Sequence, residues 1–502
     1  MSAEKTNVVW QRVDSSKQAR NAQRLRSAAR WKALLPVALY LAMMQTVGWS
    51  GETNRTDALY SVTSAKGDGK ADDTAAIQAD IAAMEAAGGG TLLLKSGTYK
   101  LTSTIRIRHS DIGIKGAGRS TVFQAVGDYG HVFDCRLDTD PTTWPGLAFV
   151  KFMDVHFDTP NDHKSGAVIY ARFSHHFEAH SVTWGNLEEG ANKAKFYDGL
   201  VLDKQDTCYV FNCQGIAKRR CFYSSGAGKY QYGAFSMNGL VRDSWFWCNA
   251  SAADGSACVY LGPSNGGIVL DTVCGAFAQY GVYAEAGNGA MNINRVSMDS
   301  LGGDAFHFAG MAADSSGLEF YNCWAGSYGQ HQKGARGLYV ASGPIVVCTG
   351  FHLGITGSAG DAIGIEADNV GVLVIADPAF MAGDFAPATG IIVGPGVKEG
   401  RISGGVVSAK GTRIVNKSAG TTVDGGTPAG AARETAVTTR EVANEAARLA
   451  LTGLKALDLC KQTDTRHVWL VVDAANVANA AGWVDLGAYT VPAGGKDQGG
   501  QK

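Results

Sequence analysis

Residues 66–118 read KGDGKADDTAAIQADIAAMEAAGGGTLLLKSGTYKLTSTIRIRHSDIGIKGAG, and this stretch decides the fold. Asp72–Thr74 can cap a helix, because the free N–H groups at a helix start need acceptors and the helix dipole favours negative charge there. Ile77, Ile81 and Met84 follow with the spacing i, i+4 and i+7, which places all three on one apolar face. We therefore predict a short helix that buries this face.

Glycines mark the turns in the rest of the stretch. The run Gly88–Gly90 ends the helix, because glycine tolerates the left-handed exit conformation, and a strand begins at Thr91. Further turns follow at 96–99 and 114–119. The order of these pieces resembles the N-terminal cap of the pectate-lyase-like right-handed parallel β-helix superfamily, which includes polysaccharide lyases, glycoside hydrolases and bacteriophage tailspikes. Lys95-Ser96 is a departure, since that family commonly has a proline before this turn.

The resemblance implies an all-β fold: a right-handed, single-stranded parallel β-helix with a short N-terminal cap helix and a small C-terminal α+β module. It assigns residues 56–118 to the cap and residues 119–427 to the β-helix body. The composition agrees, because 65 glycines among 502 residues and only 18% charged residues favour many tight corners between short strands. A net charge of −1 gives no reason to expect nucleic acid or an anionic membrane as a partner.

The N-terminal segment has the most uneven charge in the chain. Residues 1–32 hold eight Lys or Arg against Glu4 and Asp14, and the apolar run 33–44 follows. This run is shorter than the ~20 residues that a membrane span needs, so we predict no span. It can serve as the signal peptide of a secreted protein, or as an assembly segment that docks onto partner proteins. We favour the second interpretation, in which residues 1–55 form a partly helical segment that attaches to other virion or tail proteins.

A repeat of 23 to 31 residues runs through the body, and each repeat has a turn-like residue preceded by an apolar one two positions earlier. Asn and Asp suit such corners because they tolerate left-handed conformations. The predicted corner residues are Asp154, Ser181, Asn212, Asp243, Asp271, Asn294, Asn322, Thr349, Asp377 and Gly404. The side chains expected to stack in one internal ladder are Phe152, Val210, Val241, Val269, Phe320, Val347, Ile375 and Ile402, with Ala179 and Asn292 as exceptions. Burial in the ladder stabilises by about 1.5–3 kcal/mol per side chain, which no single coil achieves alone.

The sequence pattern changes after the linker-like segment 425–430. A helical stretch at about 432–451 precedes a small β-ribbon, in which 468–472 is a strand and Trp483 closes an apolar patch. This region resembles small modules of bacteriophage tail fibres and spikes. A module of this size is marginal alone, so we expect residues 428–502 to support oligomerisation, and the resembled family implies a homotrimer.

The ten cysteines show no C-x-x-C or zinc-like spacing, and most fall among apolar residues of the repeat. We therefore predict free core thiols, in keeping with folding in a reducing cytoplasm, with no metal site and no cofactor. His175, His176 and His180 do not change this, because alternate residues of a strand face opposite sides.

Three carboxylates are candidates for general acid and base chemistry on a polysaccharide. Counted from their predicted corners, Asp254 and Asp304 lie at nearly the same place on coils two apart, with Glu285 on the coil between. Asp254 and Asp304 would then be roughly 10 Å apart, near the ~6.5–9.5 Å of inverting glycosidases, and either one with Glu285 would suit the ~5–5.5 Å of retaining enzymes. The commoner role of such residues is that of solvated loop carboxylates.

Aromatic residues gather in the same coils and are candidates for carbohydrate stacking, although packing is the commoner role of such side chains. They are Trp245, Trp247, Tyr260, Tyr283, Trp324 and Tyr328.

These features predict a tailspike-like phage or prophage tail protein, made in the host cytoplasm and located in the virion, which binds a bacterial surface polysaccharide. Whether it also depolymerises that glycan, as a hydrolase or a lyase, stays open because the fold hosts both enzymes and binding proteins. Two alternatives stay open as well. One is a secreted bacterial polysaccharide lyase or glycoside hydrolase, and the other is a purely structural virion component.

Overall fold

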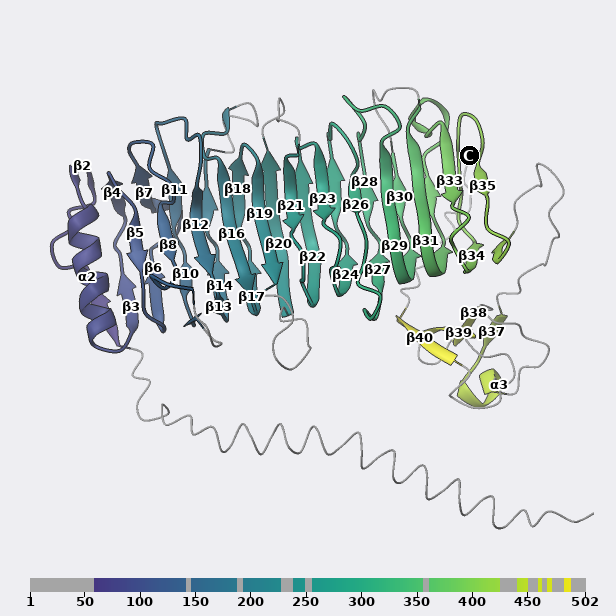
Figure 1. Ribbon diagram of the computed structural model, residues 1–502, viewed down its shortest axis with the longest axis horizontal. Helices are drawn as coiled ribbons and strands as arrows, with labels where there is room; N and C mark the ends of the chain where they lie inside the picture. The colour runs from purple at the N-terminus through teal and green to yellow at the C-terminus, as the bar shows by residue number, and fades with distance from the viewer. Residues whose placement is uncertain are drawn as a thin grey trace, which may run out of the picture. The chain divides into compact units, whose positions relative to one another are not determined.

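The computed structural model describes residues 58–140, 146–186, 193–226, 238–248, 255–354 and 361–424, together with 440–449, 459–462, 467–471 and 483–488. The first five of these ranges and most of the sixth form a right-handed parallel β-helix, as the sequence predicts (Figure 1). Each coil contributes one strand to each of three parallel sheets, which we name sheets 1, 2 and 3 in the order in which the chain visits them. The predicted segment 1–55 lies outside the described residues.

Sheet 1 follows the predicted internal ladder along the whole body. It consists of β1 (Leu59–Ser61), β3 (Gly90–Leu93), β6 (Ile112–Lys115), β10 (Lys151–Met153), β14 (Phe177–His180), β17 (Thr207–Phe211), the first parts of β20 (Asn238–Cys248) and β22 (Gly267–Ala276), β24 (Ala290–Asn294), β27 (Leu318–Tyr321), the second parts of β29 (Arg336–Thr349) and β31 (Ile363–Ala376), β34 (Glu399–Ser403) and β36 (Thr421–Val423).

Sheet 2 begins after the first corner of each coil. It consists of β2 (Asp68–Asp72), β4 (Gly97–Leu101), β7 (Thr121–Ala125), β11 (His156–Asp158), β15 (Thr183–Trp184), β18 (Gln214–Ala217), the second parts of β20 and β22, β25 (Ser297–Asp299), β28 (Trp324–Ala325), β30 (His352–Leu353) and β32 (Ala379–Phe380).

Sheet 3 completes each coil. It consists of β5 (Ile105–Ile107), β8 (Phe133–Cys135), β12 (Ala167–Arg172), β16 (Asp198–Gln205), β19 (Arg220–Gly226), β21 (Ala257–Leu261), β23 (Tyr280–Ala284), β26 (Phe306–Phe308), the first parts of β29 and β31, β33 (Thr389–Val393) and β35 (Ile414–Asn416). Smaller elements are the β9–β13 pair (Leu147–Ala148 and Ser174–His175) and the 3-10 turns η1 (Gly118–Ser120) and η4 (Gly383–Phe385).

The corner between sheets 1 and 2 is a left-handed residue in ten consecutive coils, with φ between 50° and 65°. These residues are Asp154, Ser181, Asn212, Asp243, Thr272, Arg295, Asn322, Gly350, Asp377 and Gly404. The side chain two positions before each corner points into the interior and is at most 2% exposed. This inner row is Phe152, Ala179, Val210, Val241, Leu270, Ile293, Phe320, Cys348, Ile375 and Ile402. The repeat is therefore confirmed, and its inner ladder is confirmed in seven of these ten coils.

Three predicted corners are wrong by one residue. Asp271, Asn294 and Thr349 each directly precede the actual corner. The sequence pattern for this reason predicts Val269 and Val347 in the inner row, where the structure has Leu270 and Cys348. Val269 is half-buried on the outer side of sheet 1, because its neighbour Leu270 pairs with Val241 inside. A one-residue slip of this kind reverses the face of every side chain in the strand.

The predicted cap helix is α2 (Thr74–Ala86), and its three apolar residues are fully buried. Asp72 accepts hydrogen bonds from the backbone N–H and the hydroxyl of Thr74, while Asp73 accepts from the N–H groups of Lys66 and Gly67 instead. Burial opposes ionisation of Asp72, but bonds from Thr102 and Thr74 outweigh it and lower its pKa. Gly88 and Gly89, which have positive φ angles of 88° and 122°, then lead the chain into β3.

The C-terminal module contains β37 (Arg440–Val442), α3 (Glu445–Leu449), β38 (Leu459–Gln462), β39 (His467–Val471) and β40 (Trp483–Ala488). The strands form one small sheet in the order β37-β38-β39-β40. The predicted strand at 468–472 corresponds to β39. Residues 432–439 and 450–451 of the predicted helix lie outside the described residues, and in its described half the prediction is wrong at 440–442, which form strand β37, and right at 445–449, which form α3. In the part of the chain that the structure describes, no helix combines the length and apolar content needed to cross a membrane.

Nine cysteines of the body are free thiols, as predicted. Eight of them are buried, and Cys274 is half-buried on the outer side of sheet 2.

Candidate functional site

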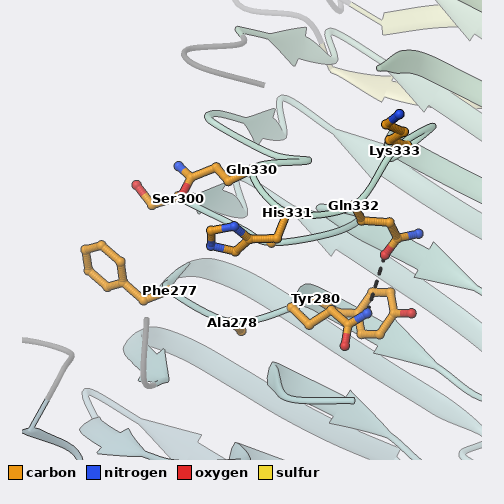
Figure 2. A pocket seen from close by; sticks show the side chains of 10 residues that line it. Phe277, Ala278, Tyr280, Ser300, Gln330, His331, Gln332 and Lys333 are labelled. Carbon is orange, nitrogen blue, oxygen red and sulfur yellow. Dashed lines mark hydrogen bonds between the residues drawn. The ribbon is translucent and has the colours of Figure 1, made fainter. Parts of the chain in front are cut away.

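A hollow of about 570 Å³ lies at the corner where the chain passes from sheet 2 to sheet 3 (Figure 2). We name it the corner hollow. Three successive coils supply its lining, namely residues 277–280 after β22, Ser300 and Gly302 after β25, and residues 330–333 after β28. The hollow is therefore built from equivalent places of neighbouring coils.

Backbone hydrogen bonds hold these three segments on one another. The Gly302 N–H donates to the Ala278 carbonyl at 2.8 Å, and the N–H groups of His331 and Gln332 donate to the Gly302 carbonyl at 3.0 and 2.9 Å. Because each segment is bonded to the one before it, the shape of the hollow is set by the stacking of the coils. Such a site is formed before a ligand arrives, which lowers the ordering cost of binding.

Neutral hydrogen-bonding groups dominate the lining. Gln279, Gln330 and Gln332 contribute side-chain amides and Ser300 a hydroxyl, and the Gln279 amide donates to Gln332 Oε1 at 3.4 Å (Figure 2). An amide offers donors and an acceptor together, which suits ligand hydroxyl groups that both donate and accept. No carboxylate is among the described lining residues, and the charged side chain there is Lys333.

Tyr280 links the corner hollow to a row of rings on the outer side of sheet 3. We name this row the tyrosine ladder; its members, in register on consecutive coils, are Tyr223, Tyr260, Tyr283, His307 and Tyr339. Consecutive ring centroids lie 5.6, 5.0, 4.9 and 5.1 Å apart. The Tyr280 ring lies 4.9 Å from that of Tyr283 and 5.3 Å from that of His307.

The rings of the tyrosine ladder cover one another's faces. The Arg220 guanidinium lies 3.9 Å from the Tyr260 ring centroid, and the Arg336 guanidinium lies 3.8 Å from that of Tyr339. Sugar rings stack on free aromatic faces, so the ladder instead presents ring edges and hydroxyl groups. Burial raises the pKa values of Tyr223, Tyr260, Tyr283 and Tyr339, which keeps these hydroxyls protonated as donors.

Glu285 is half-buried beside the tyrosine ladder. Its Oε1 accepts a hydrogen bond from the Tyr260 hydroxyl at 2.6 Å. Burial and this carboxylate together raise the pKa of Tyr260. Asp368 has the same relationship to Tyr339, at 3.0 Å.

Asp304 is fully buried, and both of its carboxylate oxygens have hydrogen-bond partners. Its carboxylate accepts the backbone N–H of Arg336 at 2.7 Å and the Arg336 guanidinium at 3.0 Å, and it lies 2.7 Å from His307 Nδ1. Burial alone would lower the pKa of Arg336, but Asp304 and Glu366 raise it overall. These contacts hold β26 and β29 together, so Asp304 is a structural ion-pair partner.

The structure does not bring Glu285 and Asp304 together. Tyr283 pairs with His307, which places Glu285 two residues beyond this pair, just after β23, and Asp304 three residues before it, just ahead of β26. Five residues along a strand correspond to roughly 17 Å, which is far more than a retaining pair of carboxylates allows. The prediction that they are neighbours is wrong, because coil lengths vary after the first corner. Asp254 lies outside the described residues.

The predicted aromatic residues divide between the faces of the body. Tyr260 and Tyr283 belong to the tyrosine ladder. Trp245 and Trp324 lie on the outer side of sheet 2 and are 48% and 36% exposed, and the Trp247 ring meets Phe277 edge-on at 5.6 Å. Tyr328 is fully buried in the core and donates to the Ile363 carbonyl at 2.8 Å. Its predicted role in carbohydrate binding is therefore wrong.

Several residues of this region are not among the sequence predictions, although the sequence holds a signal for some of them. A small residue, an apolar residue and then Tyr or His recur in five coils, as in Gly281-Val282-Tyr283 and Gly337-Leu338-Tyr339. This triplet identifies Tyr223 and Tyr339 as members of the ladder. The glutamines of the corner hollow lie in loops and follow no such pattern.

Comparison with known proteins bears on the fold. No curated protein matches the chain. Among solved structures, the N-terminal fragment of gene product 12 of bacteriophage phi29 is 13% identical, with a TM-score of 0.52 over 77% of this chain and 68% of that one. DFA-IIIase from Arthrobacter chlorophenolicus A6 is 12% identical, with a TM-score of 0.47 over 73% of this chain and 99% of that one. Tailspike protein 3 of bacteriophage CBA120 is 13% identical, with a TM-score of 0.41 over 90% of this chain and 77% of that one.

Residues 62–153 match the family model for rhamnogalacturonase A and epimerase, pectate lyase-like. The matched residues contain α2 and the first coils of the body. With three continuous parallel sheets behind them, the described body has a right-handed parallel β-helix fold like that of the pectate-lyase-like proteins.

Proposed function

We propose that this protein is a tailspike-like tail protein of a bacteriophage or prophage, and that it binds a bacterial surface polysaccharide during host attachment. The observation that carries the proposal is the corner hollow, a preformed site lined by three glutamine amides and a serine hydroxyl beside Tyr280. Sugars are recognised by hydrogen bonds to their hydroxyl groups together with contact to aromatic rings. The corner hollow offers both kinds of contact at one place.

The virion setting has separate support. Gene product 12 of phi29, which shares the fold, is a bacteriophage protein. In the proposal, residues 1–55 attach the chain to other tail proteins, residues 56–427 form the cap and the glycan-binding body, and residues 428–502 help to hold a homotrimer together. The protein is then made in the host cytoplasm and is carried in the virion.

Binding is favoured over cleavage as the core of the proposal. Of the three carboxylates considered for catalysis, Asp304 is buried by Arg336 and His307, and Glu285 lies some way along the neighbouring strand. A catalytic role for Glu285 or Asp254 stays a prediction. Release of reducing ends or unsaturated products from a bound glycan would add depolymerisation to the proposed function.

The test is binding of the full-length protein to immobilised capsular polysaccharides and lipopolysaccharide O-chains from a panel of bacteria. We expect the wild type to bind at least one of them, and the double variant Gln279→Ala, Gln332→Ala to bind it about tenfold or more weakly, since each lost hydrogen bond contributes ~0.5–1.5 kcal/mol. Gln124→Ala removes a half-buried amide from a distant coil of sheet 2 and should bind as the wild type does. Retained binding by the double variant, or silence of the wild type across the panel, would overturn the proposal.

A further inference from the structure

Two tryptophans occupy the same register position on the outer side of sheet 2. Trp245 pairs with Cys274, Cys274 with Ser297, and Ser297 with Trp324, so the indoles stand three coils apart. Adjacent coils are ~4.8 Å apart, which separates the two indoles by roughly 14 Å along the axis of the β-helix.

The indoles differ from the tyrosine ladder in what they expose. Trp245 and Trp324 are among the most exposed large apolar side chains of the described body, and within the described residues no aromatic ring packs on either of them. The coils between them carry only the short side chains of Cys274 and Ser297 at this position. Free indole faces are the surfaces on which the C–H faces of sugar rings stack, whereas the faces in the ladder are already covered.

The floor between the two indoles is polar and fixed. Asp299 lies two residues after Ser297, and its Oδ1 accepts the N–H groups of Ser300 at 2.7 Å and Ser327 at 2.9 Å. Its half-buried carboxylate is therefore held in place, in the register row next to that of Ser297. Ala276, which pairs with Asp299, adds no bulk. We name this surface, with Trp245 and Trp324 as its walls, the tryptophan trough.

The tryptophan trough runs into the corner hollow. Ser300 lines the hollow and directly follows Asp299, and Phe277 lines the hollow and directly follows Ala276. The Phe277 ring also contacts Trp247, the neighbour of Trp245 on β20. The trough therefore adjoins the hollow at Asp299-Ser300 and at Ala276-Phe277.

We propose that the tryptophan trough is a second glycan-binding subsite, in which a polysaccharide lies along the axis of the β-helix with pyranose rings stacked on Trp245 and Trp324 and a sugar hydroxyl donating to Asp299. This proposal rests on the proposed function and adds the direction and the chemical class of the ligand: a chain of pyranosides with an apolar ring face. A second protein chain fits less well, because protein interfaces have a contiguous apolar centre, and here polar short residues separate two isolated rings.

The experiment compares Trp245→Ala, Trp324→Ala and the double variant with the wild type, using the polysaccharide that the wild type binds and short oligosaccharides cut from it. For the polysaccharide we expect each single variant to bind about 3- to 10-fold more weakly and the double variant to lose the product of both factors. A fragment too short to reach from one indole to the other contacts one indole at a time. Its affinity for the double variant should therefore be little lower than its affinity for whichever single variant binds it more weakly. Ile345→Ala removes another exposed apolar side chain, on sheet 1, and should leave binding unchanged.

Cys274 gives a readout that needs no substitution. Its half-buried thiol lies on the floor of the trough, so bound polysaccharide should slow its alkylation by iodoacetamide, measured by peptide mass spectrometry. Unchanged alkylation and unchanged affinity in the tryptophan variants, with binding still lost in Gln279→Ala, Gln332→Ala, would overturn the trough and leave the proposed function standing. Wild-type silence toward every glycan would overturn both. Conversion of an oligomer to a monomer by Trp245→Ala or Trp324→Ala, seen by sedimentation, would identify the trough as a protein interface and overturn the proposal.

Discussion

Tyr260 donates its hydroxyl proton to Glu285 on the next coil, with 2.6 Å between the two oxygens. Burial raises the pKa of Tyr260, and the negative charge of Glu285 raises it further. A folded-state pKa above the unfolded value of ~10 means that the folded protein holds this proton more tightly. The resulting stability is fully present below pH ~10 and is lost as the pH rises through the folded pKa.

We therefore predict that Glu285→Gln lowers the pKa of Tyr260, because the amide still accepts the hydrogen bond but carries no charge. Ultraviolet absorbance of tyrosinate measures the change, and Tyr260→Phe identifies which transition belongs to this residue. Glu319→Gln, which removes a carboxylate near Tyr321, is the matched control. An unchanged Tyr260 transition in Glu285→Gln would show that burial alone sets its pKa.

Asp304→Asn should destabilise the body strongly. The substitution removes the fully buried counter-charge of Arg336, although half-buried Glu366 still lies 3.3 Å from the guanidinium. Breaking one partner of a buried pair costs ~3–5 kcal/mol. The measurement is urea unfolding followed by circular dichroism. Asp243→Asn breaks an exposed pair with Arg242 and should change the unfolding free energy by less than ~1 kcal/mol. Equal effects of the two substitutions would contradict a structural role for Asp304.

Gly350→Val tests the position of a corner. Gly350 has a φ of 62°, and a Cβ there would lie 2.5 Å from Asn322 Oδ1 on the preceding coil. A left-handed conformation costs a β-branched residue ~1–2 kcal/mol before this clash is counted. Thr349→Val changes the adjacent residue at ordinary strand geometry and should be nearly neutral. If Thr349→Val were the more damaging substitution in thermal unfolding, the corner would be misplaced.

Gly215→Ala should destabilise the coils around Trp184. A Cβ on Gly215 would lie 1.8 Å from the buried indole of Trp184, which occupies the interior space beside this glycine. Overpacking of a core typically costs ~1–3 kcal/mol, and here the bulky indole has to move. Gly130→Ala places the same methyl group where nothing lies within 4 Å, so it should have little effect on urea unfolding.

The sequence predicts the coil architecture well, because one apolar row and one corner per coil are local patterns. It places seven of the ten corners correctly. Two of the failures are at Thr272 and Arg295, which adopt the left-handed conformation. The residue before each of them, Asp271 or Asn294, has the stronger intrinsic preference for that conformation. At these corners the hydrogen bonds between coils and the inward packing of Leu270 and Ile293 outweigh local preference.

The candidate site is much less predictable from the sequence. Its residues come from the corner between sheets 2 and 3, which follows a sheet 2 segment and a loop of variable length in each coil. Counting from the first corner therefore placed Glu285 and Asp304 together although the register separates them. The glutamines of the corner hollow become neighbours only through hydrogen bonds between loops such as that from Gly302 to Ala278. Such relationships depend on the three-dimensional stack.

Helix α2 contacts β3 and β5 and buries Ile77, Ile81 and Met84 against the first cross-section of the interior. An open end of a parallel β-helix would offer unpaired strand edges and apolar side chains, which are templates for the addition of strands from another molecule. Since chains fold from the N-terminus during synthesis, helix α2 leaves the ribosome before most of the coils do. Helix α2 therefore covers the first cross-section of the interior while the remaining coils are still being translated.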